Sequence, residues 1–321
     1  MKHLGKITAF AGLILAIWLF ARDDFSNIVA LLRQAGPGLL LASLIHVFPM
    51  ALNAHAWRVI LPGARRPGLA SMLRIVWVRE AVNGLLPVAR IGGEVVSYRL
   101  LRRIGVRRSP AVASLTVDMA LSVLSQLAFA LLGVAFLQAQ GAGSLAMQIT
   151  LALAVLALLA IIFVAVQHGG LFERVMRVLN RLAAGRFEEA IGHSARIDRA
   201  VQAMYGRRRA IISCLFLQFA GWIAGAAEIW LALWFLGHPV GVIDAIIIEA
   251  VIQAVSSAAF LVPGALGVQE AAFMLIGATL GLGPAPALAL AAARRLRDCV
   301  VFMPGLVSWQ IAETEKLRQA Q

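Results

Sequence analysis

The chain has 321 residues, of which 61% are hydrophobic and only 14% are charged, and its formal net charge is +13. Soluble domains carry about 45–50% apolar and about 25% charged residues, so this composition excludes a soluble enzyme and predicts a polytopic integral membrane protein. The positive charge does not indicate a nucleic-acid partner. The basic residues gather in short connections between apolar segments, which is where the cytoplasmic loops of membrane proteins carry them.

Six apolar segments are each long enough to cross a bilayer, which takes about 20 residues in a helix. We predict spans at residues 4–21, 37–61, 110–137, 145–167, 210–236 and 286–311. The first segment follows Lys2 and Lys6 and lacks a small-residue cleavage site at its end, so we expect a retained span rather than a cleaved signal peptide. The expected fold is all-α.

Residues 69–98 are apolar, but arginines flank both ends, and the segment is too short for two full crossings, which need about 40 residues. Pro87 lies near the middle. We therefore predict a re-entrant hairpin that enters from the cytoplasm and is broken at this proline, surrounded by protein or by a watery cavity. The alternative is a pair of helices lying in the membrane interface.

Lysine and arginine are concentrated in every second connection, which predicts that both termini are cytoplasmic. The long connection 168–209 holds nine arginines, whereas the connections 138–144 and 237–241 hold none. Within the long connection, apolar side chains recur at helical spacing over residues 171–182, with arginines opposite them. This pattern predicts an amphipathic helix on the inner leaflet.

The two halves of the chain match without a gap at a shift of 176 residues. At this shift Pro87 falls on Pro263, and Glu94 falls on Glu270. Such internal matches indicate a structural repeat.

Each half then contains three spans and one broken hairpin, and an odd number of crossings inverts the second half in the membrane. We predict inverted repeats at residues 1–144 and 145–321, with the second hairpin, residues 242–281, opening from outside or crossing fully twice. Inverted repeats with broken helices are typical of alternating-access transporters.

Ionisable residues at membrane depth cost about 2.5–3.5 kcal/mol each, and here they cluster near the two breaks. Asp118 and Arg294 occupy equivalent repeat positions, each about 12 Å deep at 1.5 Å per residue, and we expect them to pair near the midplane, directly or through neighbours, in at least one state of the transport cycle. The charges predict a ligand cavity lined by Arg79, Glu80, Arg90, Glu94, Asp118, Glu249, Glu270, Arg294 and Arg295. The alternative is a set of internal ion pairs that fix the hairpins and hold no ligand.

Patterns for metal binding and catalysis are absent from the sequence. The two cysteines form no CxxC pair, the six histidines form no HExxH, and His46 and His55 lie on opposite faces of one helix. No GxSxG, P-loop or dinucleotide fingerprint occurs. We expect no metal and no cofactor.

Two runs resemble motifs of the lysylphosphatidylglycerol synthase transmembrane, or flippase-like, family. They are VNGLLPVARIGGE at 82–94 and VPGALGVQE at 262–270. The flanking residues 77–80 and 97–99 are most similar to the branch associated with hopanoid biosynthesis in bacteria. The resemblance implies a multi-pass protein of the bacterial inner membrane that translocates lipids.

By matching positions, the resemblance also implies site residues. They are Asn83, Pro87, Gly93, Glu94, Asp118, Pro263, Gly267 and Glu270. The chain departs from the family pattern at Met119, where an arginine often follows the aspartate, and at Ala265, where a second glycine often follows the proline. It also lacks the soluble aminoacyl-transferase domain of the synthases, so we expect it not to synthesise lysyl-lipids, and our first expectation is a protein that is not an enzyme.

Three functions remain open. The first is a lipid translocator acting on a hopanoid or another polar lipid, such as an anionic phospholipid. The second is a scaffold that holds lipid-synthesis enzymes together without transport. The third is an intramembrane enzyme acting on a lipid head group with Glu94 or Asp118 as acid or base. Charged breaks in both halves favour the translocator. A scaffold needs no charged break, and an enzyme needs only one cavity.

Overall fold

The computed structural model describes residues 14–15, 18–19, 25–63, 66–86, 92–141, 143–168, 170, 173–174, 188–259 and 262–319. The described part is all-helical, as predicted. Most of the predicted first span, residues 4–21, and most of the predicted amphipathic helix at 171–182 lie outside the described residues. So do Pro87 and Arg90.

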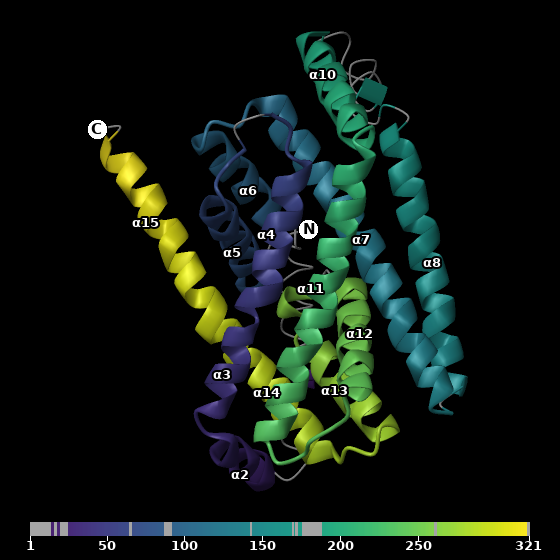
Figure 1. The fold of residues 1–321 in the computed structure, drawn as a ribbon. Helices are drawn as coiled ribbons and strands as arrows, with labels where there is room; N and C mark the ends of the chain where they lie inside the picture. The colour runs from purple at the N-terminus through teal and green to yellow at the C-terminus, as the bar shows by residue number, and fades with distance from the viewer. Residues whose placement is uncertain are drawn as a thin grey trace.

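Long helices form the body of the molecule and run roughly along its long axis (Figure 1). They are α4 (Val47–Ile60), which continues the shorter α3 (Gly38–Ile45), α7 (Arg108–Ala139), α8 (Gly143–His168) and α11 (Arg208–Phe235). The segments Gly38–Ile60, Arg108–Ala139 and Arg208–Phe235 are long and apolar enough to cross a membrane, and they coincide with three predicted spans. Helix α8 coincides with a fourth, at 145–167.

The predicted hairpin at 69–98 is a pair of helices, α5 (Leu69–Leu85) and α6 (Gly92–Arg103). A second pair, α12 (Val242–Ala258) and α13 (Val268–Thr279), occupies the predicted second hairpin. The two pairs lie at opposite ends of the molecule, with α5 and α6 in the upper half of Figure 1 and α12 and α13 in the lower half. Whether each pair enters the bilayer from one face stays a prediction.

The predicted last span, 286–311, lies within one helical stretch that changes its character. Helix α14 (Pro284–Arg297) passes through a π-helical turn, Asp298–Phe302, into α15 (Met303–Gln319). Shorter helices cap the two ends of the molecule, with α2 (Phe25–Ala35) at the bottom and α10 (Glu188–Tyr205) at the top of Figure 1.

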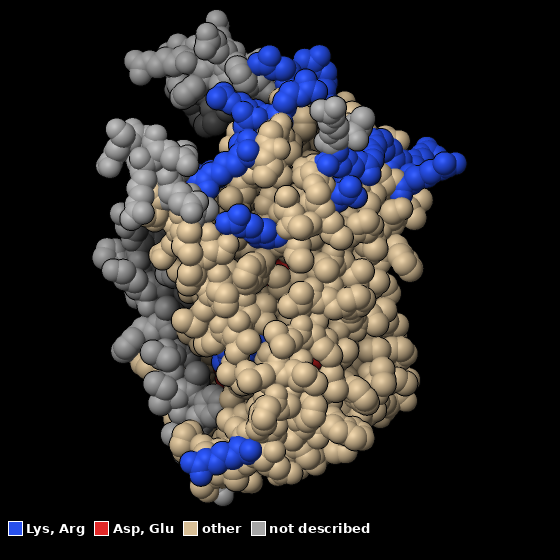
Figure 2. Space-filling view, turned by 60° about the vertical axis from the view of Figure 1, so that its left-hand side comes forward, with Lys and Arg blue, Asp and Glu red and all other residues tan. Residues whose placement is uncertain are grey.

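The surface is divided into apolar and basic regions. Large apolar side chains of the long helices are exposed, among them Phe216, Leu151 and Ile161. On the face shown in Figure 2, lysine and arginine gather mainly at the upper end, above a broad region with very few charged atoms. Helices α6, α7 and α11 all carry arginines where they begin or end at this side.

Two apolar clusters pack the interior. One is built mainly from α11 to α14 with α2 and α3, and includes Phe273 and Leu288. The other is built from α4, α5 and α7, and includes Trp57 and Met72. Ion pairs between buried charged residues join helices of one cluster to helices of the other. These charges are paired because burying an unpaired charge in an apolar interior costs much free energy.

Candidate functional site

The two helix breaks approach each other inside the molecule. The second break contains a 3₁₀ turn, Pro263–Ala265, and three residues in the left-handed region: Gly264 (φ 59°), Ala265 (φ 47°) and Gly267 (φ 74°). A Cβ built on Gly264 would lie 3.4 Å from the carbonyl oxygen of Gly84, in the last turn of α5. The tips of the two helix pairs are therefore in contact.

The first pair is closed by Asn83 and Gly93. Asn83 Oδ1 accepts a hydrogen bond of 2.9 Å from the backbone N–H of Gly93, across the break. A Cβ on Gly93 would lie 2.6 Å from the carbonyl oxygen of Arg79 and equally near the Asn83 side chain, so α6 meets α5 where only a glycine fits. These two residues shape the hairpin.

Asp118 pairs with Arg79 in this structure, where it forms no direct pair with Arg294, so a pairing of Asp118 and Arg294 in another state or through neighbours stays a prediction. Arg79 Nη1 donates to Asp118 Oδ2 over 2.7 Å, and Gln218 Nε2 donates to Asp118 Oδ1 over 3.0 Å. Arg79 also bonds Asn53 Oδ1 and lies over the ring of Trp57. The pair ties α5 to α7 within the first half instead of joining the two halves.

Arg294 is held by two carboxylates on neighbouring helices. Its Nη2 donates to both oxygens of Glu249 over 3.0 and 2.8 Å, and its Nη1 donates to Glu228 Oε1 over 3.3 Å. All three side chains are at most 5% exposed. Because Glu228 on α11 and Glu249 on α12 already pair with Arg294, its buried charge is balanced without Asp118.

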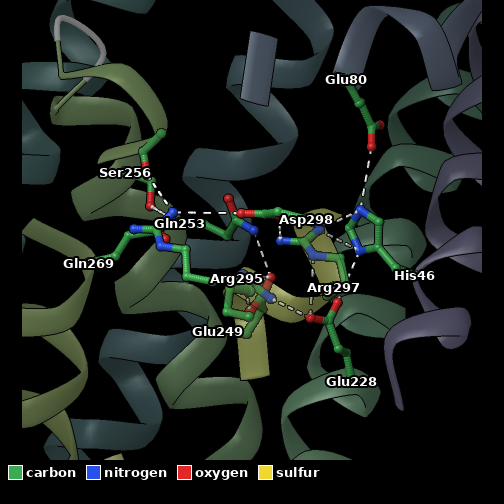
Figure 3. A network of polar contacts seen from close by, with 12 residues as sticks. His46, Glu80, Glu228, Glu249, Gln253, Ser256, Gln269, Arg295, Arg297 and Asp298 are labelled. Atoms are coloured by element: carbon green, nitrogen blue, oxygen red, sulfur yellow. Dashed lines mark hydrogen bonds and ion pairs between the residues drawn. The ribbon is translucent and has the colours of Figure 1, made fainter. Parts of the chain in front are cut away.

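Around Glu228 a larger network spans both halves of the chain (Figure 3). His46, at the junction of α3 and α4, lies 3.0 Å from Glu228 Oε2 and 3.4 Å from Glu80 Oε2 through its two ring nitrogens. Arg297 Nη1 lies 2.8 Å from His46 Nε2, and Arg297 Nη2 pairs with Asp298 over 3.0 Å. Helices α3, α5, α11 and α14 meet at this one histidine.

The sequence suggested His46 only as a possible metal ligand, and we did not predict that Glu80, Glu228 and Arg297 would all contact it. An ionisable residue inside an apolar span was the available signal, since such residues face the interior and take partners there. Among the described residues, no group of three or more histidine, cysteine or acidic side chains is placed to hold a metal ion.

Arg295 connects α14 to the second break. Its Nε donates to Glu270 Oε1 over 2.9 Å, and its Nη1 donates to the carbonyl oxygen of Gly264 over 2.7 Å. A weaker contact of 3.6 Å joins it to Asp298. Arg295 therefore fixes the 3₁₀ turn and the first turn of α13 to the helix beside them. Its side chain is 26% exposed, more than that of any other arginine in the network.

Glu94 and Glu270 occupy the same position in the two helices that follow the breaks, the third residue of α6 and of α13. Each has one carboxylate oxygen, Oε2, that is buried and meets no hydrogen-bond donor among the described residues. A buried acceptor without a partner costs free energy, about 1–3 kcal/mol or more for a charged group. Oε2 of Glu94 and Oε2 of Glu270 can each accept a hydrogen bond from a hydroxyl or ammonium group.

The described part of the network contains more acidic than basic groups. Its four arginines are Arg79, Arg294, Arg295 and Arg297, and its seven carboxylates are Glu80, Glu94, Asp118, Glu228, Glu249, Glu270 and Asp298. This excess of carboxylates favours a ligand that brings hydroxyl or cationic groups over one that brings further negative charge.

One family matches the chain. The model of the lysylphosphatidylglycerol synthase TM region matches residues 6–305, which include both breaks and the whole ionic network. No curated protein matches the chain.

Proposed function

The chain belongs to the lysylphosphatidylglycerol synthase TM region family of multi-pass membrane proteins, and on this premise we propose that it translocates a polar lipid between the leaflets of the bacterial inner membrane. The contact of two helix breaks beside a buried ionic network is the observation that carries the proposal. Charged side chains at such depth are expensive, and they mark substrate pathways in membrane proteins.

An inverted repeat is part of this proposal. The bounds of α6, moved by 176 residues, are those of α13, and the first residue of α7, Arg108, moves onto the first residue of α14, Pro284. The two broken helix pairs lie at opposite ends of the molecule (Figure 1). Both observations support two related halves of opposite orientation, in which each hairpin opens toward one side of the membrane.

The proposed orientation puts both termini in the cytoplasm. The end of the molecule rich in arginine, which carries α10 and the end of α15, then faces the cytoplasm by the positive-inside rule. Membrane lipids are the proposed partners, together with the enzymes that make them.

The proposed head group carries hydroxyl or amino groups, as a polar hopanoid would. Its support is the excess of carboxylates in the network and the two unpartnered oxygens of Glu94 and Glu270. Equivalent acceptors in both halves suit a ligand that is passed from one hairpin to the other. An intramembrane enzyme would need only one of them, and we propose that the protein has no enzymatic activity.

The test replaces the two carboxylates without changing their size. Glu94→Gln and Glu270→Gln keep one oxygen acceptor but lose the charge, and we expect each to reduce translocation of a labelled polar lipid in proteoliposomes by tenfold or more. Asp244→Asn is the control, because it removes a carboxylate charge from the first turn of α12, outside the network, where Asp244 accepts a hydrogen bond of 2.7 Å from Gln140. Lipids that co-purify with each variant, identified by mass spectrometry, would name the substrate.

Wild-type translocation by both network variants would overturn the cavity assignment and favour the scaffold. A variant that melts well below the wild type in detergent is replaced by the corresponding aspartate, Glu94→Asp or Glu270→Asp, which keeps the charge and shortens the side chain.

A further inference from the structure

A second polar site lies at the arginine-rich end, away from the central network. It is a hollow of about 470 Å³ between the end of α6, the beginning of α7 and the end of α15. Its lining residues are Tyr98, Arg99, Arg102, Arg103, Arg108 and Glu313. None of them belongs to the network around Glu228 and Arg294.

The hollow has an unbalanced charge. Its one carboxylate, Glu313, pairs with Arg103 over 2.6 Å, and Arg102 donates to the carbonyl oxygen of Val106 over 2.6 Å. Arg99 and Arg108 have no carboxylate within ion-pair distance among the described residues. Four guanidinium groups therefore face one acidic group.

The positive-inside rule explains why arginines lie at this end, but it does not require four of them to line one hollow. Arg107 is an arginine at the same end that does not line the hollow, although it directly precedes Arg108 in the sequence. Guanidinium groups bind phosphate oxygens through paired hydrogen bonds, and a cluster of them is a common phosphate site.

We propose that this hollow binds the phosphate group of an anionic lipid in the inner leaflet. The lipid source is indicated by α6 itself, where Val95 is 49% exposed and lies one helical turn before Arg99. Residues four apart share a helix face, so an acyl chain along Val95 would place its phosphate at Arg99. Helix α6 and the end of α15, which contribute to the hollow, lie in the upper half of the molecule in Figure 1.

The site stands whether or not the protein translocates lipid, and it differs in chemistry from the acidic network. Phosphate in the hollow would also compete with Glu313 for Arg103, since both are anions within reach of the same guanidinium group.

The experiment measures binding of phosphatidylglycerol to the full chain in detergent micelles by native mass spectrometry. Arg99→Gln and Arg108→Gln should each weaken binding about fivefold, the effect of about 1 kcal/mol per basic residue near an anionic lipid, and the double variant correspondingly more. Arg107→Gln is the matched control, with the same change in net charge one residue away, and should bind like the wild type. Arg108→Lys should retain most of the binding.

An equal loss in Arg107→Gln and Arg108→Gln would show only a diffuse positive field and would overturn the site. Glycerol phosphate and inorganic phosphate form the second arm. If they bind with the same dependence on Arg99 and Arg108 while the lipid does not, the phosphate site stands and the lipid source is overturned. Wild-type translocation by both Glu94→Gln and Glu270→Gln would overturn the cavity assignment of the proposed function and leave this result untouched.

Discussion

The pair of Arg79 and Asp118 offers the sharpest test of how the buried charges are arranged. Both side chains are at most 11% exposed, and they are joined over 2.7 Å. Removing one member of a buried ion pair costs about 3–5 kcal/mol, because the other charge stays inside without a partner. Gln218 still donates to Asp118 and Asn53 still accepts from Arg79, so we expect the lower end of this range, about 3 kcal/mol.

The assay is thermal unfolding of the purified protein in detergent. At roughly 2 °C per kcal/mol, the lower value for larger domains, Arg79→Gln and Asp118→Asn should each lower the melting temperature by about 6 °C. The double variant should lose clearly less than the sum of the two, because no lone charge remains inside.

A second cycle combines Asp118→Asn with Arg294→Gln. These changes should be additive, because Arg294 is bound by Glu228 and Glu249 and shares no partner with Asp118. Additivity between Arg79 and Asp118, together with strong coupling between Arg294 and Asp118, would refute the pairing described above and restore the pair expected from the repeat.

Three further outcomes follow from the packing and the orientation. Gly133→Ala would overlap the Cβ of Ala250 where α7 crosses α12, and should destabilise the protein by about 1–3 kcal/mol, whereas Gly206→Ala, with no atom closer than 3.5 Å, should change the melting temperature far less. Ala265→Gly should raise the melting temperature, since a left-handed conformation costs a non-glycine residue about 1–2 kcal/mol; an unchanged value would mean that the strain is absent. Reporter fusions after α15 should be active in the cytoplasm, and a periplasmic signal would overturn the topology.

The helix pattern could be predicted from the sequence because it depends on local chemistry. Apolar runs of sufficient length predicted the long apolar helices at Gly38–Ile60, Arg108–Ala139 and Arg208–Phe235, each long enough to cross a membrane. Helix α5 ends at Leu85 and α12 ends at Ala258, each shortly before a proline that the sequence placed at a break, and the acidic third residue of α6 and α13 fits the positive end of a helix. Ala265, the departure from the family pattern, turned out to be a left-handed residue.

The choice of partners could not be predicted in the same way. Depth along a helix placed Asp118 and Arg294 at similar levels, but it does not say which face each helix turns to its neighbours. Pairing depends on helix rotation and crossing, which side chains from the whole core decide. His46 shows this most clearly, because its partners Glu80, Glu228 and Arg297 come from three other helices that lie far apart in the sequence.

The π turn at Asp298–Phe302 makes the number of residues between α14 and α15 as important for packing as their chemical type. A π turn holds one more residue than an α turn, so it offsets the residues after it by about 100° around the axis. With this offset, Arg294, Arg295 and Arg297 face the core while Ser308 on α15 still reaches Arg74 of α5 over 3.3 Å. Loss of one residue after Asp298 would leave Arg294, Arg295 and Arg297 in place and yet rotate α15, with Ser308 and Glu313, away from its contacts with α5 and α6.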